Sequence, residues 1–220
     1  MTKHLIVDLS VPVGADTQVY PGDPTLEFSV HSTIERDGFN LLNVRMGSQT
    51  GTHVDAPYHF SESGLRIDEI PLDRFVGRGV IVDARAAGAR GRIGWDLIAP
   101  VVDQVQAGSI VILHTGWSAH YGTERYFENP FLDADACRRL IGLGVRTFAI
   151  DALNIDETPD DDHAGEGFPC HHLIADVGGV IGENLTNVGA IDFDEPFISL
   201  LPIAFEAADG APVRAVAMRF

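Results

Sequence analysis

The chain has 220 residues, of which 45% are apolar and 21% charged, and its 32 acidic side chains outnumber 15 basic ones to give a formal net charge of −17. A folded chain of this length buries about 70 to 75% of the surface that its unfolded form exposes, so its stability requires neither a disulfide framework nor a structural metal. The negative charge repels phosphate backbones and anionic headgroups, which excludes nucleic acids and membrane surfaces as partners.

The predicted secondary structure consists mostly of short strands, rich in Val, Ile, Leu or Phe and bounded by turn residues. The expected strands, in chain order, are residues 4–9, 26–31, 41–46, 79–83, 109–114, 147–150 and 211–220. Two helices are expected. Residues 96–106 have apolar side chains at helical spacing, and residues 133–143 begin with acidic residues and are followed by a glycine. These elements predict a β-rich α/β fold in a single domain, residues 1–220, without the regular alternation of a barrel or a doubly wound sheet.

Two cysteines, Cys137 and Cys170, are too few for a disulfide framework and do not form a CxxC pair. No apolar stretch reaches the ~18 residues of a membrane helix, and the N-terminus lacks the apolar region of a signal peptide. The most apolar run, residues 197–205, contains Pro202. The expected compartment is therefore a reducing cytoplasm.

Several enzyme classes are disfavoured by missing motifs. The sequence has no GxGxxG after a strand, no GxxxxGK[ST], no HExxH and no GxSxG. These absences argue against dinucleotide binding, P-loop chemistry, zincins and elbow-type serine hydrolases. The acidic run of residues 156–162 lacks the spacing of a calcium loop and is expected to be a solvated loop.

The most informative segment is QTGTHVDAPYHF, residues 49–60. In an extended segment side chains alternate between faces, so Gln49, His53 and Asp55 point to the same side and can converge on one cation. Gly51 permits an unusual backbone angle before this set, and a proline after it ends regular pairing. His59 can then stand beside the ion as a general acid or base. An H-x-D pair alone is common on a polar strand, but the flanking glycine and proline favour a metal site.

This segment resembles the HxGTHxDxPxH motif of the metal-dependent cyclase family, which contains bacterial kynurenine formamidases and isatin hydrolases. Gln49 stands where the motif has its first His, and a Gln there is similar to the QxxxHxDxxxxH pattern of trans-dienelactone hydrolases. Further matches, in the family's order, are residues 8–10, 20–24, 114–117, 150–151, 156, 171 and 183–185.

The resemblance implies a swivelling β/β/α fold and a set of site residues. It makes His53 and Asp55 metal ligands, with Gln49 in the place of a third, and His59 the general acid or base. In members with two ions, a later His and Glu hold the second ion, and the matching positions are His171 and Glu183, with His172 left open. The ion is expected to be Zn²⁺ or Mn²⁺, in one or two copies. Tyr20 and Trp117 are expected to lie beside the substrate.

The resemblance also implies a hydrolase that uses metal-activated water on a small carbonyl substrate. The bond that the enzyme is mainly expected to hydrolyse is an amide C–N bond, as in the aryl formamide N-formylkynurenine or the cyclic amide isatin. Gln49 favours a lactone hydrolase of the dienelactone type instead. A third alternative is a non-catalytic protein that binds a small molecule or a metal. A homodimer or homotetramer is expected.

Overall fold

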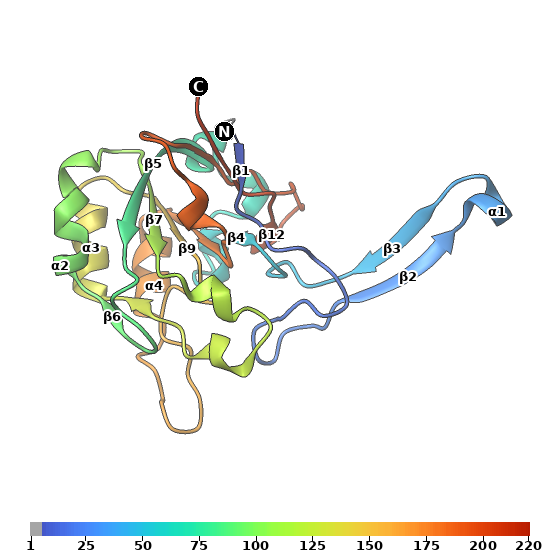
Figure 1. Ribbon diagram of the computed structural model, residues 1–220, viewed down its shortest axis with the longest axis horizontal. Coiled ribbons are helices and arrows are strands. Elements are labelled where there is room, and N and C mark those ends of the chain that lie inside the picture. The colour runs from blue at the N-terminus through green and yellow to red at the C-terminus, as the bar shows by residue number, and fades with distance from the viewer. Residues whose placement is uncertain (1–5) are drawn as a thin grey trace.

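The computed structural model describes residues 6–220, and its centre is a nine-stranded mixed sheet (Figure 1). The four middle strands are parallel neighbours and follow chain order. They are β5 (Val76–Asp83), β7 (Ile110–His114), β9 (Thr147–Ile150) and β10 (Val180–Glu183). The crossovers between them contain α2 (Trp95–Ile98), α3 (Ala134–Gly142) and α4 (Pro169–Asp176). The middle of the chain therefore alternates strand and helix, which was not expected from the sequence.

The middle strands are buried on both faces, as continuous apolar runs in parallel strands are expected to be. Along β7, Val111 and Leu113 belong to the apolar cluster that packs under α3 and α4, whereas Ile110 and Ile112 belong to the cluster on the opposite face. The helices of the crossovers contact one another, α2 with α3 and α3 with α4, and lie together on one side of the sheet in Figure 1. Such one-sided packing follows when successive parallel strands advance in one direction with crossovers of one hand.

Antiparallel strands extend the sheet on both flanks. Beyond β5 lie β11 (Phe197–Ser199), β13 (Val216–Met218) and β1 (Ile6–Asp8), in that order. Beyond β10 lie β4 (His53–Asp55) and β12 (Gly210–Pro212), so β4 has β10 on one side and β12 on the other. Two short strands, β6 (Arg92–Ile93) and β8 (Phe131–Leu132), pair separately.

Short segments of 3₁₀ helix connect many of these elements. They are Pro57–His59, Ile67–Glu69, Leu72–Arg74, Ala99–Gln104, Trp117–His120, Glu124–Phe127 and Val188–Ala190. Within residues 6–220, no helix has the length and apolar character needed to cross a bilayer.

Several expected elements differ in extent from those of the structure, and three of them differ for a reason that can be named. The helix expected over residues 96–106 is α2 followed by the 3₁₀ segment Ala99–Gln104, because Pro100 has no N–H and its ring clashes with the carbonyl four residues earlier. The strand expected over residues 211–220 is two strands, β12 and β13, on opposite flanks of the sheet. The strand expected over residues 4–9 is present as β1, and residues 4 and 5 lie outside the described residues. The helix expected over residues 133–143 is confirmed as α3, where the Asp133 side chain caps the first turn.

An antiparallel ribbon of β2 (Glu27–Ser32) and β3 (Leu41–Arg45) extends away from the sheet, with the single-turn helix α1 (Ile34–Asp37) at its tip (Figure 1). We call residues 27–45 the arm. Every residue of β3 is exposed, and so is every residue of β2 except Ser32. The arm therefore contributes almost nothing to the core of its own chain.

Candidate metal centre

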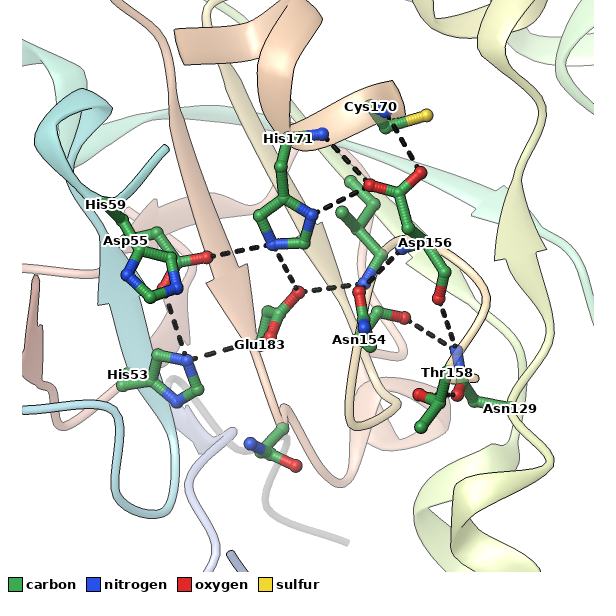
Figure 2. A network of polar contacts seen from close by, with 12 residues as sticks. His53, Asp55, His59, Asn129, Asn154, Asp156, Thr158, Cys170, His171 and Glu183 are labelled. Carbon is green, nitrogen blue, oxygen red and sulfur yellow. Dashed lines mark hydrogen bonds and ion pairs between the residues drawn. The ribbon is translucent and has the colours of Figure 1, made fainter. Parts of the chain in front are cut away.

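Strand β4 brings the first two candidate ligands together. His53 and Asp55 are two residues apart and share one face, and His53 lies directly opposite Glu183 of β10. The Nε2 atom of His53 lies 3.3 Å from Asp55 Oδ1 and 3.7 Å from Glu183 Oε2. All three side chains are buried (Figure 2). Alternation along β4 and the pairing of β4 with β10 thus bring three ligand groups close together, although the two strands are distant in the chain.

Helix α4 supplies a fourth group. The Nε2 atom of His171 lies 3.4 Å from Asp55 Oδ2 and 3.5 Å from Glu183 Oε1. His171 is buried, whereas His172 is exposed, because consecutive side chains on a helix point about 100° apart. The structure therefore brings His171, and not His172, into the cluster.

Hydrogen bonds orient both imidazoles. His53 Nδ1 lies 2.8 Å from the carbonyl oxygen of Gly51, and His171 Nδ1 lies 2.8 Å from Asp156 Oδ2. A carbonyl or carboxylate oxygen only accepts, so Nδ1 carries a proton in both rings, and when a ring is neutral its Nε2 lone pair faces the cluster. Asp156 also accepts from the backbone N–H groups of Cys170 and His171, at 3.0 Å each, and so holds the first turn of α4 in place (Figure 2).

The donor set fits a divalent cation. Ligand atoms of His53, Asp55 and Glu183 lie within 4.8 Å of one another. Both carboxylate oxygens of Asp55 and the Oε1 atom of Gln49 are buried and accept no hydrogen bond from the described residues. Buried carboxylate oxygens without a partner are strongly unfavourable. A cation bound among these atoms would satisfy them all at once.

The pKa values of the cluster show the same need for positive charge. Burial acts to lower the pKa of both histidines, but the neighbouring carboxylates outweigh it. Asp55 and Glu183 raise the pKa of His53 to about 9. Asp156 and Asp55 raise the pKa of His171 to about 10. Burial, together with the charge of Asp55, raises the pKa of Glu183 to about 7. Burial also acts to raise the pKa of Asp55, yet its two imidazole neighbours hold it below the ordinary value. Protons on the imidazoles thus supply the charge that a metal ion would otherwise bring.

Gln49 enters the site through a turn and not through strand alternation. Strand β4 begins only at His53, and Gly51 between them has φ of +68°. The Gln49 amide nitrogen donates to Asp209 Oδ2 at 2.9 Å, which leaves Oε1 as its free atom. The amide lies against Gly210, where a Cβ would come within 2.6 Å of Nε2 and 2.7 Å of Oε1.

His59 lies in the 3₁₀ turn after β4, and its partner was not identified from the sequence. Its Nδ1 atom donates to Asp209 Oδ2 at 3.0 Å, and Asp209 Oδ1 accepts from the Ser48 hydroxyl at 2.7 Å. The hydrogen bond from His59 comes first among the causes that lower the pKa of Asp209 to about 2. Burial lowers the pKa of His59, but Asp209 and Asp55 raise it to a net value above the ordinary one. The Nε2 atom of His59 is left without a partner in the described chain.

The cluster forms one wall of a cavity of about 270 Å³. Gln49, His53, Asp55, His59, His171 and Glu183 all line it. The rest of the wall is mixed. Tyr20, Phe60, Leu153 and Phe168 form an apolar and aromatic part, in which the two phenylalanine rings lie 5.5 Å apart, and the polar part consists of Gln18, Asp23, Asn154 and Asn184. This volume is near the lower end of the range for small-molecule sites, and the wall suits a flat aromatic group.

Two expected placements differ from the structure. Trp117 does not line the cavity; its ring is 5% exposed in the core under the helices, and its Nε1 donates to the carbonyl oxygen of Tyr126. Asp156 is not part of a solvated loop, because its carboxylate is buried against α4, whereas Asp160 to Asp162 are exposed.

Comparison with known proteins identifies the family of the chain. The model of the Cyclase family matches residues 7–157. A kynurenine formamidase of Bacillus cytotoxicus is 30% identical over 212 residues, which cover 96% of this chain and 95% of that protein.

Two solved structures are similar in fold. Isatin hydrolase A from Labrenzia aggregata superposes with a TM-score of 0.86 at 25% identity, over 97% of this chain and 93% of the other. A structure described as a potential metal-dependent hydrolase with cyclase activity gives a TM-score of 0.78 at 29% identity, over 98% of each chain. Together with the cluster of His53, Asp55, His171 and Glu183, these matches establish that the chain belongs to the Cyclase family of hydrolases.

Proposed function

We propose that the chain hydrolyses the amide C–N bond of a small aromatic substrate, with an N-formyl aryl amine as the preferred class. The observation that carries this proposal is the buried cluster of unpartnered ligand atoms beside His59, at one wall of a cavity with aromatic sides. The similarity of the chain to a kynurenine formamidase, over nearly the whole length of both, supports an amide C–N bond as the bond that is cleaved.

Gln49, His53, Asp55, His171 and Glu183 would hold the ion. Three oxygen and two nitrogen donors make Mn²⁺ as suitable as Zn²⁺. When bound, such an ion polarises a substrate carbonyl and makes water more acidic.

His59 moves the proton. Its Nδ1–H is held by Asp209, so the lone pair on Nε2 is free to take a proton from the attacking water. The imidazolium that forms is stabilised by the Asp209 carboxylate, which lies 3.0 Å from Nδ1. The same Nε2–H then donates to the nitrogen of the leaving amine, which departs as a neutral molecule.

The aromatic wall positions the substrate. Phe60 and Phe168 line the cavity together with the half-buried Tyr20, and their rings offer faces and edges on which an aryl group can pack. A substrate ring held there would present its amide to the cluster.

The direct test is a panel of N-formylkynurenine, isatin and a trans-dienelactone, hydrolysed by enzyme reconstituted with Mn²⁺ or Zn²⁺. We expect the formamide to have the highest kcat/KM. His59→Ala should keep its metal by elemental analysis and lose ~10²-fold or more in kcat, whereas His172→Ala, a change at an exposed neighbour of the site, should keep both. If the His59→Ala enzyme were fully active, His59 would not be the residue that transfers the proton.

Gln49 favours one second candidate, a lactone hydrolase. A neutral amide oxygen replaces an imidazole in the ligand set, as it does in the dienelactone hydrolase pattern that the segment resembles. Faster turnover of the lactone than of the formamide in the same panel would select this alternative, and no turnover of any substrate would favour a binding protein.

We place the chain in the cytoplasm. Cys137 and Cys170 are both free and buried in the core, as is usual for proteins of a reducing compartment. Cell fractionation with an antibody to the chain tests this placement.

A further inference from the structure

Phe168, one of the aromatic residues of the cavity wall, has an unusual backbone conformation. Its φ of +59° and ψ of 51° lie in the left-handed region, where a bulky side chain is rarely found. The next residue is Pro169, and a residue before proline normally adopts an extended conformation. Strained backbone of this kind persists only where the surrounding structure holds it. Contacts on both sides of Phe168 must therefore keep its ring in the wall.

The ring of Phe168 packs beside the metal cluster. Its centroid lies 5.5 Å from that of Phe60 and 5.9 Å from that of His171, which it meets edge to face. The rings of Phe60 and His171 are themselves 4.3 Å apart, so the three rings form one aromatic group. Displacement of Phe168 would widen the cavity and would remove one of the rings that cover His171.

Helix α4 fixes the backbone that follows Phe168. The carbonyl oxygen of Phe168 accepts from the N–H of His172 at 3.2 Å, within the first turn of the helix. Asp156 holds the same turn through the N–H groups of Cys170 and His171. Any movement of the Phe168 ring must therefore come from the chain before it.

The chain before Phe168 is a long loop. Residues 157–167 leave the body below α4 and β6 and return to it, in light orange in Figure 1, and residues 160–164 are all exposed. Gly165 and Gly167 have φ of +67° and +75°, a conformation that glycine adopts at no steric cost. Together with Phe168 they form a run of left-handed turns at the start of α4, which is suited to act as a hinge.

Arg90 anchors the first leg of this loop, residues 157–160. Its guanidinium donates to the carbonyl oxygen of Thr158 at 2.9 Å and forms ion pairs with Glu157 and Asp160. The side chain of Arg90 is only 14% exposed. The first leg is therefore firmly attached to the body.

Arg92 holds the second leg, residues 164–167. Its guanidinium forms an ion pair with Glu166 and a second one, at 3.4 Å, with Asp133 beside α3. The ion pair with Glu166 is the polar contact that joins the second leg to the rest of residues 6–220. The two side chains are 49% and 46% exposed. Exposed ion pairs contribute little stability and are screened by salt, so the second leg is held weakly.

We propose that the second leg is a gate that places Phe168 in the cavity wall, with Glu166 as its positioning residue and Arg92 as the partner that keeps it closed. When the ion pair breaks, the hinge turns, Phe168 leaves its left-handed conformation, and the cavity opens toward larger aryl groups. Phe168 then sets the size of the aryl group that the cavity accepts. This inference rests on the proposed function for its kinetic test and is independent of it for its binding test.

The kinetic test compares formanilide, a single-ring formamide, with the fused-ring N-formyl-2-naphthylamine. We expect Phe168→Ala to raise kcat/KM for the naphthyl amide relative to formanilide by ~10-fold or more, mainly through KM. Phe168→Gly removes the ring without backbone strain and should act alike. Glu166→Gln and Arg92→Gln should raise the same ratio about 3-fold, since an exposed ion pair shifts the closed population by this order.

The pair of Arg92 and Glu166 can be separated from a general loss of structure. The variant that carries both Arg92→Gln and Glu166→Gln should have the ratio of either single change, because both act through one contact. Arg92→Lys keeps the charge and should keep the wild-type ratio. High salt should raise the ratio in the wild type but not in Glu166→Gln. Both substrates are uncharged, so the net charge of the chain does not enter this comparison.

The matched control is Arg138→Gln. It removes another exposed ion pair, that of Arg138 with Asp135 on α3, which lies outside the loop. It should keep the wild-type ratio at every salt concentration. A ratio that Phe168→Ala or Glu166→Gln leaves unchanged, or that Arg138→Gln changes equally, would overturn the gate. Circular dichroism of each variant separates these outcomes from misfolding.

The binding test measures the Kd of 2-naphthylamine by calorimetry, with the chain reconstituted with Mn²⁺. We expect tighter binding in Phe168→Ala by ~10-fold and in Glu166→Gln by about 3-fold, and no change in Arg138→Gln. If neither amide were hydrolysed but the Kd changed in this way, the proposed function would fail and the gate would stand. Hydrolysis of both amides in the same ratio by every variant would keep the function and remove the gate. Neither hydrolysis nor binding in any variant would overturn both.

Discussion

Asp209 accepts hydrogen bonds from three side chains around the site, those of Ser48, Gln49 and His59. A carboxylate can only accept, so it fixes the orientation of both the Gln49 amide and the His59 ring. The free atoms that result are Gln49 Oε1 and His59 Nε2. Asp209 thus acts as a positioning residue for a candidate ligand and for the candidate acid or base.

Asp209→Asn should shift the acid limb of the kcat/KM profile to lower pH. His59 must be neutral to take a proton, so the rate rises with pH through its pKa, and Asp209 is one of the groups that raise that pKa above 6.5. Without the Asp209 carboxylate, only Asp55 is left to oppose the effect of burial, and the pKa of His59 falls. We also expect kcat to fall about 10-fold or more, because the ring loses its orientation.

The control for this prediction is Ser48→Ala, which removes another hydrogen bond to Asp209 but leaves the one from His59. It should keep the acid limb in place. An unchanged limb in Asp209→Asn would show that the carboxylate does not set the pKa of His59.

At the scale of residues, the sequence predicts the arrangement of side chains that are close together along the chain. His53 and Asp55 share a face through strand alternation, and the structure shows them doing so. Asp209 could not be predicted, since it is 150 residues from His59 and reaches it through the pairing of β12 with β4. Trp117 was expected beside the substrate because a motif match cannot distinguish a side chain that faces the cavity from one that faces the core.

At the scale of elements, helix α4 depends on Asp156. The carboxylate accepts from two backbone N–H groups of its first turn and from the ring of His171. Residues that orient a metal-binding histidine commonly contribute 10- to 100-fold to metal affinity, as an order of magnitude.

Asp156→Ala should therefore weaken metal binding about 10- to 100-fold, measured by competition with a chromogenic chelator. It should also destabilise the chain by about 1 to 3 kcal/mol, because the backbone N–H groups of Cys170 and His171 lose their acceptor. Asp160→Ala is the matched control in the same loop, because that carboxylate is exposed and bonds Arg90 and His163. Equal metal affinity in the wild type and Asp156→Ala would contradict the orienting role.

The contact of β12 with β4 gives a further prediction. Gly210→Ala would place a Cβ 2.6 Å from both the carbonyl oxygen of Val54 and the amide nitrogen of Gln49. Because one of these atoms is backbone, we expect a loss of about 1 to 3 kcal/mol in the free energy of unfolding.

Denaturant titration of this variant measures the loss, and Gly142→Ala at the end of α3, where a Cβ meets no atom within 4 Å, is its control. If Gly210→Ala were as stable as this control, the amide of Gln49 would not be packed as the structure places it.

Elements were predicted well where apolar runs are long, as in β7 and β9, and poorly where they are short or polar. Helix α4 begins Pro-Cys-His-His and strand β10 contains Gly182 and Glu183, so neither has a clear apolar period. Both are held by tertiary contacts with β9 and α3. The break after α2, in contrast, follows from Pro100.

At the scale of the whole molecule, stability should depend on metal and pH together. The pKa values of His53, about 9, and His171, about 10, exceed the unfolded value near 6.5. In the metal-free chain the resulting stabilisation is fully present below about pH 6.5 and is lost as the pH rises through 9 to 10. A metal ion requires the neutral rings, so its own stabilising effect grows over the same range.

We therefore expect the difference in Tm between the metal-loaded and the chelated protein to increase from about pH 6 to about pH 9. Thermal unfolding with Mn²⁺ or with a chelator, at several pH values, measures it. His172→Ala should behave as the wild type. A difference that stays constant or shrinks as the pH rises would rule out His53 and His171 as ligands.

The position of β4 between β10 and β12 has a consequence for how the protein is made. Synthesis proceeds from the N-terminus, so His53 and Asp55 leave the ribosome long before either neighbouring strand exists. Asp209, which orients His59, is made 150 residues after it. A nascent chain that stops before β12 has neither that carboxylate nor the strand that closes β4, and its site is incomplete. Metal loading is thus expected to be among the last events of maturation, so that unfinished chains neither retain the ion nor act on substrate.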